Sequence, residues 1–199
     1  MGYIKEEIKK LIKGKGRSSA AKEQMAWFES GLSNRKEKSI VSVRSRFISG
    51  KIYVFEYSPI TKDLEWFDEN PVVLALDPYD GDDIGINLSL LPPNIREDLL
   101  DEVYTRNQSA IKSAAKITKN ADKQRGLLRF SYEGAKRYLE LKGFDFAIRR
   151  YKPNRKSKQA VIAYKDWCKV ALVDFNSLNG VTKNQLARLF EDHRRKRNI

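Results

Sequence analysis

The chain has 199 residues, of which 41% are hydrophobic and 33% are charged, and its formal net charge at pH 7 is +13. This composition supplies one globular core under a densely ionic surface and excludes disorder throughout the chain. No apolar run approaches the roughly 20 residues of a membrane-spanning helix, and the N-terminal residues lack the apolar centre of a signal peptide. We therefore expect no membrane partner and a cytosol-like compartment.

Charge is distributed unevenly along the chain. Residues 1–50 carry 12 basic and 5 acidic side chains, whereas residues 51–103 carry 3 basic and 13 acidic ones. Charge added only for solubility would not need such segregation. The pattern predicts an acidic body flanked by cationic segments that could face the phosphates of a nucleic acid.

The N-terminal region is predicted to be helical. The spacing of its apolar residues predicts a helix over residues 3–13. A second helix is expected from Ala20 to Ser30, with Ser18 or Ser19 as its cap. We predict that residues 1–35 form an N-terminal helical arm.

The next region carries the pattern of short strands. Runs of β-branched and aromatic residues alternate with clusters of Pro, Gly, Asp and Ser, which are typical of turns. Strands are expected at residues 39–43, 51–57, 64–67, 72–76 and 84–91. Their close spacing predicts a small, strongly curved antiparallel β-sheet or, as the alternative, an SH3-like barrel.

Helices and strands are both predicted in the second half of the chain. Asn94 is expected to cap a helix over residues 95–104, and Gly143 is expected to end one over residues 132–141. Residues 105–126 hold few large apolar side chains and predict a loop or a loosely held helix.

The remaining predicted elements complete an α+β fold with flanking helices and basic arms. Strands are expected at residues 159–164 and 169–175, and Thr182 is expected to cap a last helix over residues 182–194. The predicted organisation is the helical arm, an α+β core over residues 36–175 with a basic loop at 149–158, and a C-terminal helix with a basic tail over residues 176–199.

The strongest local signal is the basic loop from Arg149 to Lys158, which has six cations among ten residues. Such cations displace condensed counterions from duplex DNA, and the tyrosine among them could stack on an exposed base at a strand end. A solvated loop is the alternative. The expected nucleic-acid-binding residues are Arg149, Arg150, Tyr151, Lys152, Arg155, Lys156 and Lys158, with Arg194, Arg195, Lys196 and Arg197 as an auxiliary group. No motif for reading base sequence accompanies them, so sequence-independent binding of double-stranded DNA is expected.

The sequence offers little for catalysis. Cys168 and His193 are the only residues of their kinds, which leaves no thiolate-rich zinc site and no histidine-based active site. Asp80, Asp82 and Asp83 depart from the spacing of a calcium loop, so an exposed turn is the favoured interpretation. The alternative is a two-metal nuclease that uses the carboxylates of Asp63, Asp68, Asp77 and Asp82. No phosphate-binding or dinucleotide-binding loop is present, and we expect no catalytic residue, no metal, no other cofactor and no enzymatic activity.

A series of short motifs follows a definite order along the chain. In that order they are Trp27-Phe28, Gly50-Lys51-Ile52-Tyr53, Tyr57-Ser58-Pro59, Lys62-Asp63-Leu64, Trp66-Phe67-Asp68, Pro71-Val72-Val73, Gly85-Ile86-Asn87-Leu88 and Leu91-Pro92-Pro93. This series resembles the DNA end protector family of tailed bacteriophages, and a weaker similarity continues through Arg149-Arg150-Tyr151 to Asp166-Trp167. The matching residues are mostly apolar, Gly or Pro, and they carry the fold and no chemistry.

The resemblance implies a virion protein that binds the ends of the packaged genome, shields them from exonucleases and completes the filled head without catalysis. The implied partners are double-stranded DNA ends and phage portal, neck or head proteins, and formation of a homo-oligomer stays open. The implied locations are the head or the head–tail junction of the virion, and the host cytoplasm during assembly and after injection. The acidic body would then face outward or contact a basic protein neighbour.

A structural head–tail connector is the alternative function. In this hypothesis residues 1–35 and 176–199 anchor to neighbouring neck or portal subunits, and the basic surface has no end-specific role.

Overall fold

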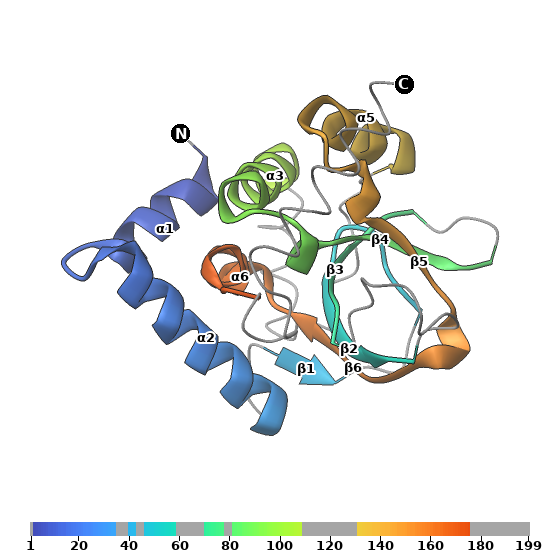
Figure 1. The fold of residues 1–199 in the computed structure, drawn as a ribbon, viewed down its shortest axis with the longest axis horizontal. Coiled ribbons are helices and arrows are strands. Elements are labelled where there is room, and N and C mark those ends of the chain that lie inside the picture. The colour runs from blue at the N-terminus through green and yellow to red at the C-terminus, as the bar shows by residue number, and fades with distance from the viewer. Residues whose placement is uncertain are drawn as a thin grey trace.

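The protein is a mixture of helices and one antiparallel sheet, as Figure 1 shows for the computed structural model. The structure describes residues 2–34, 40–42, 46–58, 70–77, 81–108 and 131–175. The helices are α1 (Tyr3–Ile12), α2 (Gly16–Asn34), α3 (Pro93–Arg106), α5 (Tyr132–Lys142) and α6 (Trp167–Leu172). The strands are β1 (Ile40–Ser42), β2 (Ile52–Tyr57), β3 (Val72–Ala75), β4 (Asp83–Asn87), β5 (Ile148–Tyr151) and β6 (Lys156–Ile162). Short 3-10 helices are η1 (Leu88–Leu90), η2 (Asp145–Ala147), η3 (Pro153–Arg155) and η4 (Tyr164–Asp166). The predicted α+β class is confirmed.

The sheet has the strand order β1-β6-β2-β3-β4-β5. It is curved because the connection between β5 and β6 is short, although three other strands lie between them. In a flat sheet β6 and β5 would lie four strand spacings, or about 19 Å, apart. The chain from Tyr151 to Lys156 reaches at most about 17 Å when fully extended, and η3 shortens it further. The sheet must therefore bend until the ends of β2 and β5 meet, where the backbone N–H of Lys152 donates a hydrogen bond of 3.3 Å to the Tyr57 hydroxyl.

This curved sheet does not close, so the SH3-like barrel is not supported. Within the described residues, β1 and β5 are the two edge strands and do not pair with each other. The physical reason is that β6 uses both of its edges, because Ile162 pairs with Ile40 of β1 on one side and with Ile52 of β2 on the other. No free edge of β6 is left there for β5.

The two faces of the sheet carry separate apolar clusters, as the two-residue periodicity of a strand requires. On one face, Ile52, Leu74 and Ile162 pack into the large core under the helices. On the other face lies an aromatic cluster, which we define as Phe47, Tyr53, Phe55, Tyr57 and Tyr151 with the aliphatic residues around them. The rings of Phe55 and Tyr151 come from β2 and β5 and are centred 5.2 Å apart, so the aromatic cluster lies on the inner, concave side of the curve.

Close packing of β3 against β4 on the concave side depends on Gly85. A Cβ atom at this position would lie 2.2 Å from Cγ1 of Val73 and 2.8 Å from the carbonyl oxygen of Leu74. Any larger residue would push these strands apart, because the second of these atoms belongs to the backbone. This requirement explains why a glycine occupies the middle of a strand.

The helical layer, which we define as α1, α3 and α6, covers the convex face of the sheet, and α2 runs along its outer side (Figure 1). Ile4 and Ile8 of α1 are buried against this layer. The domain limits predicted at residues 35 and 176 stay predictions. No helix within the described ranges is both long enough and apolar enough to span a bilayer.

Several predicted elements are confirmed, including the helix over residues 132–141 and its end at Gly143, where the backbone φ is 76°. The strands predicted at 51–57 and 72–76 are also present as β2 and β3. Predictions at residues 64–67, 109–126 and 182–194 lie outside the described residues.

Other predicted boundaries are wrong. α2 begins at Gly16, before either serine proposed as its cap, and α3 begins at Pro93 without a side-chain cap from Asn94. β4 ends at Asn87, because the side chain of Asn87 accepts a hydrogen bond from the backbone of Ser89 and starts η1.

The predicted strand at residues 169–175 is also wrong, because α6 occupies most of it. Its residues Val170, Ala171 and Leu172 are all buried, and a short apolar run that is buried on every side has no periodicity to separate helix from strand.

Candidate nucleic-acid interface

The basic segment, residues 149–158, is not the loop that the sequence predicts. It consists of the end of β5, the turn η3 and the start of β6. In β5, Arg149 pairs with Gly85 and Arg150 with Ile84 of β4, and in β6 Lys156 pairs with Tyr57 of β2. Backbone pairing therefore fixes the positions of three of the six cations, and it holds both ends of the turn that carries two others.

Asp82 gathers two cations of the basic segment at the start of β4. Its Oδ2 lies 2.8 Å from Nη2 of Arg150 and 2.9 Å from Nζ of Lys152. The side chain of Asp82 is 6% exposed, whereas those of Arg150 and Lys152 are 49% and 48% exposed. The hydrogen bond from Lys152 lowers the pKa of Asp82, burial opposes this shift, and Arg150 adds to it. The carboxylate is therefore ionised at neutral pH, and it holds both half-exposed cations from its buried position.

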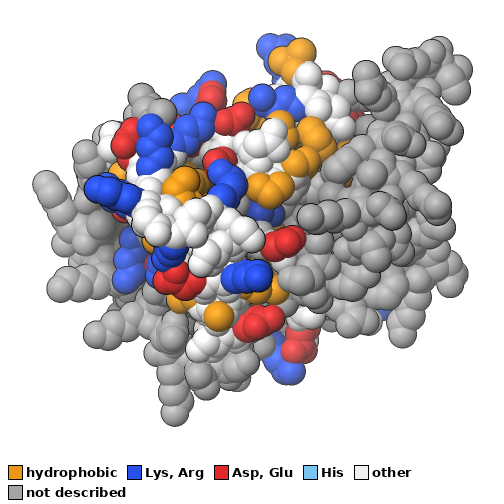
Figure 2. Space-filling model, turned by 60° about the vertical axis from the view of Figure 1, so that its left-hand side comes forward, with side chains coloured by type: hydrophobic (Ala, Val, Ile, Leu, Met, Phe, Trp, Pro, Cys, Tyr) orange, Lys and Arg blue, Asp and Glu red, His pale blue; other side chains and the backbone are white. Residues whose placement is uncertain are grey.

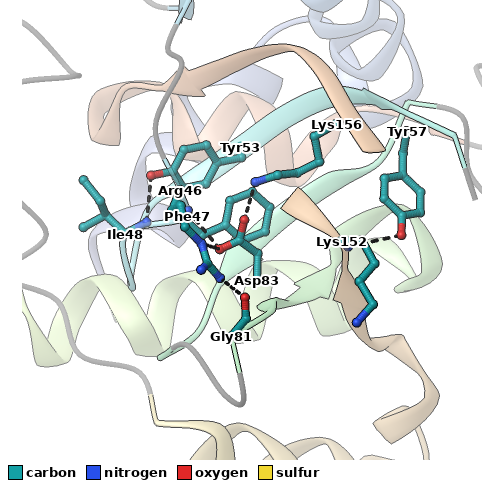
Figure 3. Close-up of polar contacts among 9 residues, drawn as sticks. All are labelled: Arg46, Phe47, Ile48, Tyr53, Tyr57, Gly81, Asp83, Lys152 and Lys156. Carbon is teal, nitrogen blue, oxygen red and sulfur yellow. Dashed lines mark hydrogen bonds and ion pairs between the residues drawn. The ribbon is translucent and has the colours of Figure 1, made fainter. Parts of the chain in front are cut away.

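Asp83, the next residue, binds cations on the other side of the strand. Its carboxylate accepts hydrogen bonds from Nε of Arg46 at 3.2 Å and from the backbone N–H of Phe47 at 3.3 Å, and it also binds Nζ of Lys156. Figure 3 shows Arg46 and Lys156 reaching Asp83 from different segments. Together with Asp82 it forms what we call the carboxylate pair.

Lys156 is buried between this carboxylate and the aromatic cluster. Its side chain is 5% exposed, and Nζ lies 4.0 Å from the centre of the Phe47 ring. Burial lowers the pKa of Lys156, while the hydrogen bond to Asp83 opposes the shift. The ammonium group is thus a partner of the core, and a phosphate cannot reach it in this conformation.

The interpretation of Asp82 and Asp83 as an exposed turn or an outward-facing acidic surface is wrong. Both are buried, and both are bound to cations that the sequence places far away. The described residues contain no group of three or more potential metal ligands. Of the other carboxylates considered for a metal site, Asp63, Asp68 and Asp80 lie outside the described residues.

Comparison with known proteins identifies the family of the chain. A family model described as the phage T4 terminal DNA protecting protein matches residues 2–190. The chain belongs to this family. The resemblance seen in the sequence is therefore confirmed. The matched range includes the basic segment and the carboxylate pair. No curated protein and no solved structure matches the chain.

The structure separates the predicted contact residues of this family member into two groups. Arg150, Lys152, Arg155 and Lys158 are exposed, and Arg149 is half-buried. Tyr151 is 4% exposed, with its ring 5.2 Å from those of Phe55 and Tyr57. The tyrosine would have to leave the aromatic cluster to stack on a base. The predicted auxiliary residues Arg194, Arg195, Lys196 and Arg197 lie outside the described residues.

The exposed cations differ in how they are held. Nζ of Lys158 lies 2.5 Å from Oε1 of Glu56 on the neighbouring strand. The guanidinium groups of Arg149 and Arg155 have no side-chain partner among the described residues. The basic segment therefore presents both anchored cations and cations that have no counter-charge within the described part of the chain.

The face with α1 and α2 has a different charge pattern. Lysine and arginine side chains there are interspersed with carboxylates (Figure 2). Lys10 pairs with Glu7 at 2.6 Å, and Arg17 pairs with Glu97. Carboxylates among the described residues therefore neutralise several cations of this face locally.

Sequence reasoning missed Arg46, Phe47 and the structural role of the carboxylate pair. Arg46 precedes β2 and meets Asp83 across 37 positions of the chain. No periodicity connects residues at that separation, so only correlated changes among related sequences could have pointed to the contact.

Proposed function

We propose that this protein binds the ends of double-stranded DNA without a chemical step and so shields them from exonucleases. The observation that carries the proposal is the basic segment, in which two paired strands and the turn between them present the exposed cations Arg150, Lys152, Arg155 and Lys158. Contacts from fixed cations to phosphates give strong binding that does not depend on base sequence. Membership of the DNA end protector family supports the choice of DNA ends as the partner.

The proposed contact residues are Arg149, Arg150, Lys152, Arg155 and Lys158, with residues 194–197 as an auxiliary group. Non-catalytic binding is supported by the carboxylate pair, because cations of the protein occupy both carboxylates. We further propose that the protein completes the packaged head beside portal, neck or head proteins, as a single copy or a homo-oligomer. Its proposed locations are the virion and, after injection, the host cytoplasm.

The test compares binding to linear and circular duplex DNA of equal length across a salt series, with exonuclease digestion in parallel. The unaltered protein should prefer linear DNA and protect it, and protection should weaken as salt rises. The double variant Arg149→Glu with Arg155→Glu should bind at least about tenfold more weakly and flatten the salt dependence by about two phosphate contacts.

The matched control reverses two exposed cations elsewhere, Lys22 on α2 and Arg106 on α3, and should bind within about twofold of the unaltered protein. α2 and β5 lie on opposite sides of the molecule (Figure 1). Equal, weak binding to linear and circular DNA without protection would contradict the proposal and favour the structural connector.

A further inference from the structure

Three cations with nearly equal exposure surround the start of β4. The side chains of Arg46, Arg150 and Lys152 are 52%, 49% and 48% exposed. The carboxylates beneath them, Asp83 and Asp82, are 1% and 6% exposed. Arg46 therefore stands in the same relation to its carboxylate as the two cations of the basic segment do to theirs.

The guanidinium of Arg46 is fixed at two points. Nε donates a hydrogen bond of 3.2 Å to Oδ1 of Asp83, and Nη2 donates one to the carbonyl oxygen of Gly81. Figure 3 shows the side chain directed at this turn. A guanidinium is a planar group with five N–H donors, so two fixed contacts hold its orientation and leave donors for an external anion. Little side-chain entropy would then be lost on binding a phosphate.

Among the described residues at this turn, the cations that contact the carboxylate pair outnumber its two carboxylates. Arg46, Arg150, Lys152 and Lys156 carry four positive charges, whereas the carboxylate pair carries two negative ones. Lys156 is itself buried against Asp83, so the exposed Arg46 is not needed to neutralise that carboxylate. An exposed ion pair contributes at most about 1 kcal/mol to stability. The half-exposed guanidinium of Arg46 is therefore available to an anionic partner.

Arg46 also lies close to the basic segment. Asp82 and Asp83 are adjacent in the chain and point to opposite sides of the strand. Arg46 contacts the carboxylate of Asp83, and Lys152 contacts that of Asp82. Adjacent residues thus hold both cations beside the same turn, and double-stranded DNA presents closely spaced charges, one per about 1.7 Å of its axis.

We infer that Arg46, outside the basic segment, binds a backbone phosphate of the same DNA, and that Asp83 is the positioning residue that holds it there. This inference rests on the proposed function. It adds the segment that precedes β2 to the interface. It also implies that the buried carboxylate pair orients cations toward phosphate.

The experiment measures the affinity of full-length variants for a linear duplex across a salt series. Arg46→Gln should weaken binding by about threefold to tenfold and lower the salt slope by about 0.9, which is the value for one lost phosphate contact on duplex DNA. Arg46→Lys should keep most of the slope, because it keeps the charge. The control Arg106→Gln removes an arginine that is 71% exposed and bound to Glu102, and it should stay within about twofold.

The salt slope separates binding from a merely structural role. If Arg46 only supported the fold, Arg46→Gln would lower the thermal midpoint and the fraction of active protein, but the slope of the remaining binding would not change. An unchanged slope and affinity in Arg46→Gln would overturn the inference. Should that substitution prevent folding, Arg46→Met is measured in its place, because it removes the charge and keeps an apolar stem. A slope lowered by about 0.9 supports the phosphate contact, and an unchanged slope and affinity overturn the inference.

The double variant at Arg149 and Arg155 is measured beside these proteins. If it binds weakly while Arg46→Gln binds normally, the inference is wrong and the proposed function stands. If the unaltered protein binds no duplex at any salt concentration, the proposed function fails and the inference fails with it.

Discussion

Buried charges in the helical layer are held by the main chain, whereas those beside the basic segment are held by opposite charges. Arg96 of α3 is 2% exposed and donates hydrogen bonds to the carbonyl oxygens of Leu88, Ala171 and Val173. Burial lowers its pKa to about 9, with Asp174 acting in the opposite direction, so it stays charged at neutral pH.

Asp101, also on α3, acts in the same way at the start of α1. Its Oδ1 accepts hydrogen bonds from the backbone N–H groups of Ile4 and Lys5 at 2.9 and 3.3 Å. Gly2 occupies the cap position and has no side chain for this purpose. A residue distant in the sequence thus supplies the missing cap of the helix.

This difference distinguishes charged groups that hold the fold together from charged groups that can bind a partner. A charge with only backbone partners fixes how elements pack, and it turns no donors toward solvent. A cation that rests on a buried carboxylate remains half exposed and presents its outer side to a partner. We therefore expect substitutions in the helical layer to lower the stability of the protein without changing the salt dependence of DNA binding. Substitutions of the exposed cations Arg46, Arg150 and Lys152 should change the salt dependence of DNA binding more than they change the stability.

The largest effect is expected from Arg96→Ala. Three buried carbonyl oxygens would lose their donor, and a cavity would replace the side chain, so the free energy of unfolding should fall by about 4 kcal/mol. Urea denaturation measures the loss, and Arg106→Ala on the exposed side of α3 should lose less than about 0.5 kcal/mol. A loss below about 1 kcal/mol in Arg96→Ala would show that the guanidinium does not hold η1 and α6 in place.

The next effect is expected from Asp83→Ala, which leaves the ammonium of Lys156 buried without its carboxylate. The free energy of unfolding should fall by about 3 kcal/mol. Adding Lys156→Met should recover much of this loss, because a methionine fits beside the aromatic cluster without a charge. A double-mutant cycle measures the coupling, and strictly additive losses would contradict the buried ion pair.

A smaller effect is expected from Asp101→Ala. Removing the cap of α1 should lower the free energy of unfolding by about 1–2 kcal/mol. Hydrogen exchange should become faster in the first turn of α1. In the control, Asp98→Ala removes a 40% exposed carboxylate that lies 2.8 Å from Nζ of Lys5, and exchange in that turn should not change. Equal exchange in both variants would argue against a tertiary cap.

The smallest effect concerns pH and Asp82. Lys152 and Arg150 hold its pKa below the ordinary value of 3.8 in the folded protein, so folding favours the ionised form. The resulting stability is fully present above pH 3.8 and is lost as pH falls through the lower, folded pKa. Urea midpoints of the unaltered protein and of Asp82→Asn should therefore differ near pH 6 and converge in acid. A difference that persists unchanged to low pH would contradict this.

Local patterns predicted the secondary structure best where periodicity was clear. The alternation in residues 51–57 gave β2 with its two faces in separate clusters, and Gly143 marked the end of α5 as only a residue without a side chain does readily. The pattern failed at α6, where every side chain except that of Lys169 is buried and neither period stands out. It also failed at the start of α2, because serines that could cap a helix can equally lie within its first turns.

The candidate site was predicted in part. The density of cations in residues 149–158 was visible at once, and so was their sequence-independent character. The burial of Tyr151 and Lys156 was not visible, because alternation in β5 and β6 sends neighbouring residues to opposite sides of a curved sheet. A count of charges cannot distinguish an anchored cation from a free one.

The sequence by itself determined the fold class, the positions of most strands, the basic segment and the family, since each of these is a local pattern or a sum of local patterns. Only the tertiary structure decided which charges meet. Asp82 reaches Lys152 across 70 positions, and Asp83 reaches Lys156 across 73. These pairs form because the short turn at η3 forces the sheet to curve and brings β5 and β6 to the two sides of one acidic turn. Curvature depends on the order of all the strands together with the short connection between β5 and β6, and no single segment carries it.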